Sequence, residues 1–181
     1  MTIQEQYQFE LARSEAEHHQ PTAGAMIGHV TANLWLHTLK IEQAMLFAKG
    51  NGALFLEKYG KEWLTTATSF RHQLNKKLRA EGDLIPTTSS ELIEFSMLTE
   101  DAAFKYTTDY DQIFDLIKAF DTQLLFINRA IVLAKNEAHY GQEVVLKELY
   151  AWIRDQILIG QKFLGHDLTT GLYTELDDDE D

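Results

Sequence analysis

The 181-residue chain contains no cysteine and no long run of apolar residues. Without cysteine it can have no disulfide bond, no thiolate metal ligand and no cysteine nucleophile. No stretch approaches the roughly 20 consecutive apolar residues that a membrane-spanning helix needs. Residues 1–21 show no basic segment followed by an apolar one, so we expect no signal peptide and a soluble protein of the cytoplasm.

Positive charge is also scarce, because 16 lysines and arginines face 28 aspartates and glutamates, for a net charge of −12. The last eight residues hold six negative charges, and the first 20 residues hold one arginine against four glutamates. An acidic body repels phosphates, and nucleic-acid-binding proteins usually carry a basic patch or arm. DNA is therefore not an expected partner, and we expect the acidic end from Thr174 to be disordered.

The apolar residues predict four long helices. Apolar side chains alternate at spacings of four and three, which forms one face of a helix, over 23–49, 54–81, 111–137 and 142–164. The four stripes are Val30, Leu34, His37, Ile41, Ala44 and Ala48; Trp63, Ala67, Phe70, Leu74 and Lys77 or Leu78; Ile113, Ile117, Phe120, Leu124, Ile127, Ile131 and Ala134; and Val145, Leu149, Trp152, Gln156, Ile159 and Phe163.

The connections between these helices are also readable. The glycine-rich joint 49–52 is short, which predicts that the first two helices form an antiparallel hairpin. The crossover 82–111 is too long for a structureless loop, and its segment 89–95 has a capped start with room for a short helix. Residues 2–19 could form a further helix, after which Thr22 could cap the first bundle helix.

Two segments in this stretch carry a family resemblance. The ordered series is HVTANLWLHTLKIEQAMLFAKG, then a predicted helix, and then EGDLIPTTSSELIEFSMLTED. In this series of segments the chain resembles the Dps family, the mini-ferritins of the ferritin superfamily. The likeness covers residues 28–104 and continues more weakly to about residue 166. It implies an all-α, ferritin-like four-helix bundle with a long crossover, containing a short helix, between the second and third helices.

The resemblance also implies a function and an assembly. Dps proteins form dodecameric homo-oligomeric shells that store iron and protect against oxidative stress, and we expect the same here. The bundle would span 23–166, between an N-terminal segment, 1–22, and an acidic tail, 167–181. Apolar residues off the core stripe of the first helix indicate either a wide core face or a subunit contact, and the resemblance favours the contact. These residues are Trp35, Leu39, Leu46 and Phe47.

In the family, iron is oxidised where two subunits meet, by two histidines and by an aspartate and a glutamate one helical turn apart. Alignment without gaps places these ligands at Met45, Glu57, His72 and Lys76, and none of the four matches the family's residue type. A lysine ammonium repels iron and offers a carboxylate a counter-charge. We therefore predict a degenerate ferroxidase centre in which Lys76 pairs with Glu57 across the subunit contact, and we do not expect ordinary ferroxidase activity.

Two alternatives stay open at this point. Glu57 and His72 could form a remodelled site that binds iron, with Glu42 or Glu62 as a further ligand. The chain could instead be a catalytically silent structural or binding four-helix protein, without iron oxidation or DNA binding.

Other histidines are weaker candidates. Glu15 and His18 form a Glu-x-x-His pair, which ordinary ferritins place inside the bundle. Here the pair lies in the N-terminal segment, which indicates either a solvated surface or a weak metal site of Glu15, His18 and His19. His37 lies on a core stripe, which predicts a hydrogen-bonded core histidine rather than a metal ligand.

Overall fold

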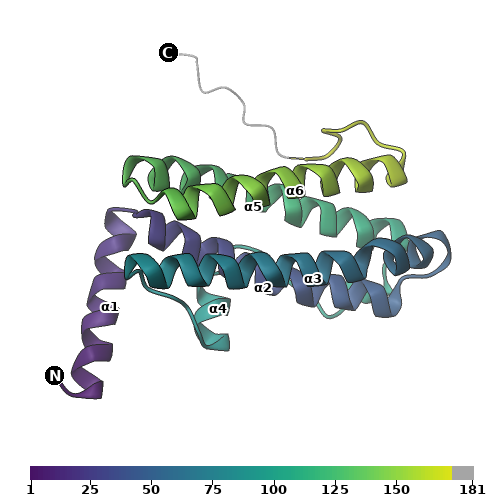
Figure 1. Cartoon of the computed structure of the whole chain (residues 1–181). Helices are drawn as coiled ribbons and strands as arrows, with labels where there is room; N and C mark the ends of the chain where they lie inside the picture. The colour runs from purple at the N-terminus through teal and green to yellow at the C-terminus, as the bar shows by residue number, and fades with distance from the viewer. Residues whose placement is uncertain (173–181) are drawn as a thin grey trace, which may run out of the picture.

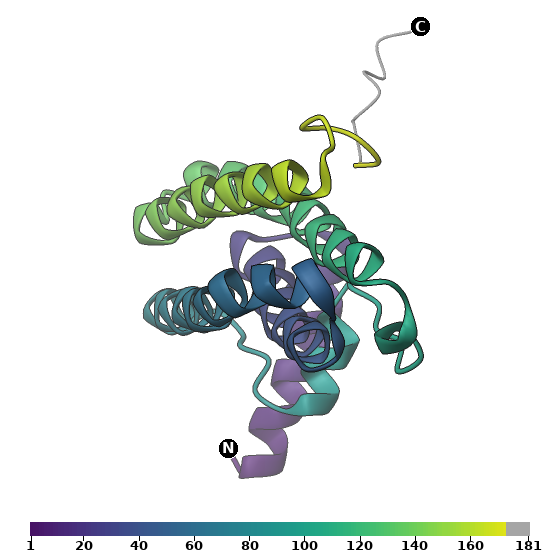
Figure 2. The same cartoon turned by 90° about the vertical axis from the view of Figure 1, so that its right-hand side faces the viewer.

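The structure is a computed structural model that describes residues 1–172. Its four long helices are α2 (Ala23–Phe47), α3 (Gly50–Glu81), α5 (Asp109–Asn136) and α6 (Tyr140–Leu164), and together they form a bundle (Figure 1). Seen from one end, α2 and α3 form one layer and α5 and α6 form the other (Figure 2). Residues 1–172 contain no strand, and no helix among them combines the length and hydropathy of a membrane span.

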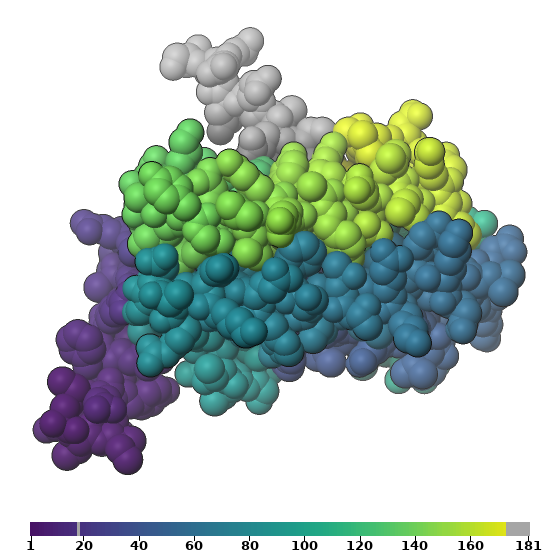
Figure 3. All heavy atoms as spheres, viewed as in Figure 1, coloured from purple at the N-terminus to yellow at the C-terminus, as the bar shows by residue number. Residues whose placement is uncertain are grey.

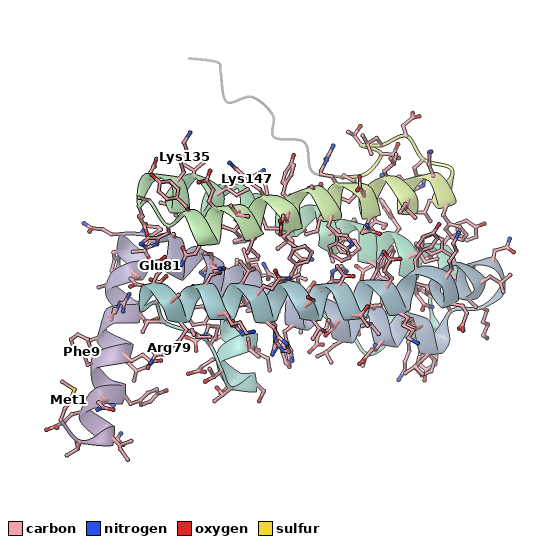
Figure 4. The ribbon with its side chains drawn as sticks, in the orientation of Figure 1. Met1, Phe9, Arg79, Glu81, Lys135 and Lys147 are labelled. Carbon is pink, nitrogen blue, oxygen red and sulfur yellow. The ribbon has the colours of Figure 1, made fainter. Side chains whose placement is uncertain are left out.

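The predicted N-terminal helix is α1 (Ile3–His19), which points away from the bundle (Figure 1). Figure 4 shows Met1 at the outer end of α1 and Phe9 partway along it. Arg13 ties the inner end of α1 to the end of α3, because its guanidinium donates to the Gly82 carbonyl at 2.8 Å and lies 3.6 Å from the Asp83 carboxylate.

The crossover between α3 and α5 contains the predicted short helix, α4 (Ser89–Phe95), and a 3-10 turn, Phe104–Tyr106. The Thr88 hydroxyl accepts a hydrogen bond from the Glu91 amide, and the Glu91 carboxylate accepts one from the Thr88 amide. Together these two bonds form a complete capping box at the start of α4. The buried Asn33 of α2 holds the residues after α4, because its side-chain oxygen accepts a hydrogen bond from the Met97 amide at 2.7 Å.

The core stripes predicted for α2, α3 and α5 are confirmed, except that Ala48, Phe70, Lys77 and Ile131 are only half-buried. On α6 the buried face is rotated toward Ile153, Ile157 and Gly160, leaving the predicted Trp152, Ile159 and Phe163 half-buried. Gly160 lies directly against Ile117 of α5, since a Cβ there would lie 2.1 Å from Cδ1 of Ile117. Any other residue at this position would require the Ile117 side chain to move in a closely packed core.

The helix bounds agree with the prediction to within a few residues, but the first joint is shorter than expected. Gly50, Asn51 and Gly52 open α3 instead of forming a loop, which leaves Ala48 and Lys49 as the joint. The Gly52 amide, which an isolated helix start would leave unpaired, donates to the Asp109 carboxylate at 2.8 Å. A Cβ on Gly52 would lie 2.5 Å from that of Asp109, so this contact requires glycine.

Glycine ends two of the long helices. Gly82 and Gly165 follow α3 and α6 with φ of 76° and 70°, the left-handed conformation that glycine adopts without a steric penalty. After Gly165 the chain folds back on the bundle, where the Gln161 side chain donates to the carbonyl of Thr170 at 3.0 Å. The acidic tail predicted to be disordered lies, from residue 173, outside the described residues.

Candidate functional site

The four positions aligned with metal ligands lie in two separate places on one chain. Met45 and Glu57 lie at the end where α2 turns into α3, whereas His72 and Lys76 lie one turn apart near the other end of α3. His72 lies fifteen positions after Glu57 on α3, a distance of about 22 Å along the helix axis. A single copy of the chain therefore cannot bring the four side chains together.

The ligand chemistry at each half-site is poor. Met45 is half-buried, and its sulfur packs over Gly60, where an added Cβ would lie 2.7 Å from Sδ. Glu57, His72 and Lys76 are exposed, and none of them forms an ion pair within the described residues. No group of three or more histidine or acidic side chains in residues 1–172 could hold a metal ion.

Unpaired positive charge gathers on α3. The helix contains six of the 16 basic residues of the chain against three glutamates, although the whole protein is strongly acidic. None of the six has a carboxylate within ion-pairing distance among the residues that the structure describes. They are Lys58, Lys61, Arg71, Lys76, Lys77 and Arg79. This helix lies along the outside of the molecule, open to an outside partner (Figure 3).

The interior of the bundle offers no second metal site. Ordinary di-iron bundles fill this region with carboxylates and histidines from facing helices. The described interior instead holds mostly amides and aromatic rings with a single buried histidine, and its buried polar residues include no aspartate or glutamate. At its centre the indole Nε1 of Trp63 donates to the side-chain oxygen of Gln156 at 2.9 Å. Phe120 packs edge-on against Trp63, with the ring centroids 5.2 Å apart.

Neither a family model nor a curated protein matches the chain, but solved structures do. The DpsB protein of Lactococcus lactis is 32% identical, with 93% of this chain and 97% of that chain covered and a TM-score of 0.87. For the DpsA protein of the same organism the identity is 32%, the coverage 92% and 98% and the TM-score 0.87. The chain belongs to the Dps family.

The Dps fold is ferritin-like, so the fold implied by the resemblance is confirmed. Dps from Listeria monocytogenes shares this fold, with a TM-score of 0.77 at 21% identity, over 81% of this chain and 96% of that chain. The Lactococcus matches extend over nearly the whole length of both chains.

In this Dps chain His37 is a core residue, as its place on the stripe predicts. Its ring is fully buried, and Nδ1 accepts a hydrogen bond of 2.9 Å from the side-chain amide of Gln123. The same amide also donates to the carbonyl of Ala119 at 3.0 Å, which fixes its orientation. Burial is the main cause that lowers the pKa of His37 to about 3, and the nearby Lys40 lowers it further, while the Leu116 carbonyl opposes the shift. A neutral imidazole is therefore part of the folded core.

This buried histidine predicts a loss of stability in mild acid. Because the folded pKa of about 3 lies below the ordinary histidine pKa of 6.5, the unfolded chain binds the proton more readily. The free energy of unfolding should therefore fall by about 1.4 kcal/mol per pH unit as the pH drops below about 6.5. Urea titrations between about pH 5 and 6.5 measure this slope, and His37→Leu should remove most of it. His72→Gln, at an exposed site, is the control and should keep the slope of the unchanged protein.

The predicted N-terminal metal site gains no support from the geometry. Glu15 and His19 lie 3.6 Å apart on α1, and their side chains are 73% and 79% exposed. The side chain of His18 lies outside the described part of the chain. An exposed pair one helical turn apart is an ordinary surface contact.

The sequence did not reveal two polar pairs in the Dps core. Gln156 lies on a predicted stripe, but nothing local indicates that its partner is Trp63, 93 positions earlier. Gln123 was not predicted to be buried, and its partner His37 is 86 positions away. The one available signal is that polar residues occur at core spacing, which implies a hydrogen-bond partner without naming it.

Proposed function

We propose that this Dps protein forms a homo-oligomeric shell that stores iron and limits oxidative damage, with a ferroxidase centre that is degenerate. The observation that carries the proposal is its identity of 32% with a Lactococcus Dps protein over almost the full length of both chains. A dodecamer is the expected assembly. Iron is the cargo in this proposal, and DNA is not a partner.

A second copy of the chain supplies the missing half of the site in this proposal. Glu57 of one copy meets His72 and Lys76 of the other, so that an ammonium occupies the place where iron would bind. Exposed, unpaired charges of opposite sign at the two half-sites support this arrangement. A divalent cation beside a fixed ammonium is electrostatically disfavoured.

An iron titration tests the proposed function. Fe(II) is added to the assembled protein in air, and separately with peroxide, while ferric absorbance and retained iron are followed. We expect iron to be retained by a particle of shell size, without a fast oxidation phase. A fast phase that saturates at about two iron ions per subunit pair, the stoichiometry of a two-metal centre, would contradict the degenerate site. A protein that sediments as a monomer and retains no iron would contradict the shell.

A further inference from the structure

A second stripe runs along the flank of α3, beside its core stripe, and its middle residue, Leu64, also packs against the core. Glu57, Leu64 and Arg71 recur every seven residues, so they lie within about 40° of one another around the helix. Glu57 is exposed, and Leu64 and Arg71 are half-buried. We call these three residues the α3 seam. Heptad spacing of this kind is the pattern by which helices pair lengthwise.

Arg71 is the residue on this seam that most clearly lacks a partner. Its Nε is buried and makes no hydrogen bond, and no carboxylate in the described part of the chain lies within ion-pairing distance of its guanidinium. It lies at a recess of about 230 Å³ between α2 and α3, lined in part by Trp35 and Thr38. Removing part of a guanidinium from water without a hydrogen-bonded partner is unfavourable, so its surroundings are incomplete in one copy.

The spacing of the seam identifies the partner. Glu57 and Arg71 lie seven residues on either side of Leu64, about 10.5 Å along the helix in each direction. A two-fold axis through Leu64 therefore places each Glu57 opposite the Arg71 of the other copy, and Leu64 opposite itself. This is the self-complementary pattern of a two-fold contact, in which residue i meets j and j meets i. Two acidic chains repel each other, so such pairs also offset an unfavourable approach.

In the two-fold contact of the proposed function, α3 faces α3 of the second copy; we propose that Leu64 lies at its axis and that two Glu57–Arg71 ion pairs flank it. The guanidinium of Arg71, and not only the ammonium of Lys76, then holds the Glu57 carboxylate. Around the helix Arg71 lies about 40° from Glu57, whereas Lys76 lies about 100° away. This inference rests on the proposed function in one respect, because the α3 seam can be paired only if the protein assembles. Whether Glu57 pairs with Arg71 does not depend on whether the protein binds iron.

Crosslinking locates the axis directly, because the chain has no cysteine of its own. Leu64→Cys should crosslink to itself on mild oxidation of the assembled protein, since a residue on the axis faces its own copy at disulfide distance. Glu62→Cys is the matched control, lying in the same helical turn but on the far side of α3 from the seam. We expect nearly complete crosslinking of Leu64→Cys and little of Glu62→Cys. Equal crosslinking of the two variants would overturn the proposed axis.

Charge exchange tests the ion pairs. Glu57→Arg and Arg71→Glu should each raise the concentration at which the assembly half-dissociates by at least about a hundredfold, because like charges then face each other twice. The double variant should return to within about tenfold of the unchanged protein. Glu62→Arg, off the seam, should have little effect, and circular dichroism checks that every variant is helical. If the double variant dissociates as easily as the single variants, the Glu57–Arg71 pairing is wrong, but the proposal of a shell still stands. If the unchanged protein is monomeric, both proposals are wrong.

Discussion

Replacement of Trp63 by alanine is expected to lower the free energy of unfolding by about 3–5 kcal/mol. Trp63 is fully buried and packs against Phe120 and Phe55, with ring centroids 5.2 and 5.7 Å apart. Alanine would leave a large cavity between the layers of the bundle. It would also remove the indole donor that satisfies Gln156, and a buried oxygen without a partner adds to the cost.

Trp152→Phe is the matched control for this variant. Trp152 belongs to the same aromatic cluster, 5.5 Å from Phe120, but it is half-buried and its Nε1 makes no hydrogen bond. We expect Trp152→Phe to lower the free energy of unfolding by less than about 1.5 kcal/mol. Urea unfolding followed by circular dichroism, at one protomer concentration for all variants, gives the comparison. If Trp63→Ala lost no more stability than Trp152→Phe, the bundle would not depend on this central ring.

Replacement of Lys76 by methionine is expected to raise the affinity of the assembled protein for a divalent metal by about 30-fold. A unit charge 4 Å from a divalent ion contributes roughly 2 kcal/mol of repulsion in water, which corresponds to that factor. Methionine keeps the length of the side chain while removing its charge, so Glu57 and His72 of facing copies would regain a place for a cation. The measurement is a titration with Co(II), which is not oxidised in air as readily as iron.

Lys58→Met is the control, because it removes the same charge from the same exposed helix at a position outside the proposed site. It should leave the affinity for Co(II) within about twofold of the unchanged protein, since exposed charges farther away are screened. Sedimentation checks that both variants assemble. Equal affinities in the two variants would show that Lys76 does not exclude metal.

The sequence predicts the bundle well because local rules decide most of it. Residue spacing alone gives three of the four core stripes. The chemistry of helix caps gives the start of α4 and the glycines that end α3 and α6. The two misjudged features depend on distant contacts. Gly52 lies in the first turn of α3, where Asp109 of α5 pairs with its amide, and the buried face of α6 includes Gly160, which packs against Ile117 of α5. Neither partner can be read from the neighbouring sequence.

In the candidate site, too, some features could be predicted from the sequence and others could not. The separation of Glu57 from His72 and Lys76 follows from helix geometry once α3 is continuous, so the need for a second copy could be foreseen. That the buried Nε of Arg71 lacks a hydrogen-bond partner could not be foreseen, because it depends on how α2 and α3 pack around the recess beside Trp35.

A crystal structure of the assembled protein soaked in Fe(II), with anomalous diffraction recorded at the iron edge, tests most directly whether the ferroxidase centre is degenerate. We expect no iron peak between Glu57 and the facing His72, and we expect cationic side chains of the second copy to bind the Glu57 carboxylate. An iron peak coordinated by Glu57 and His72, with the ammonium of Lys76 turned away, would contradict this expectation.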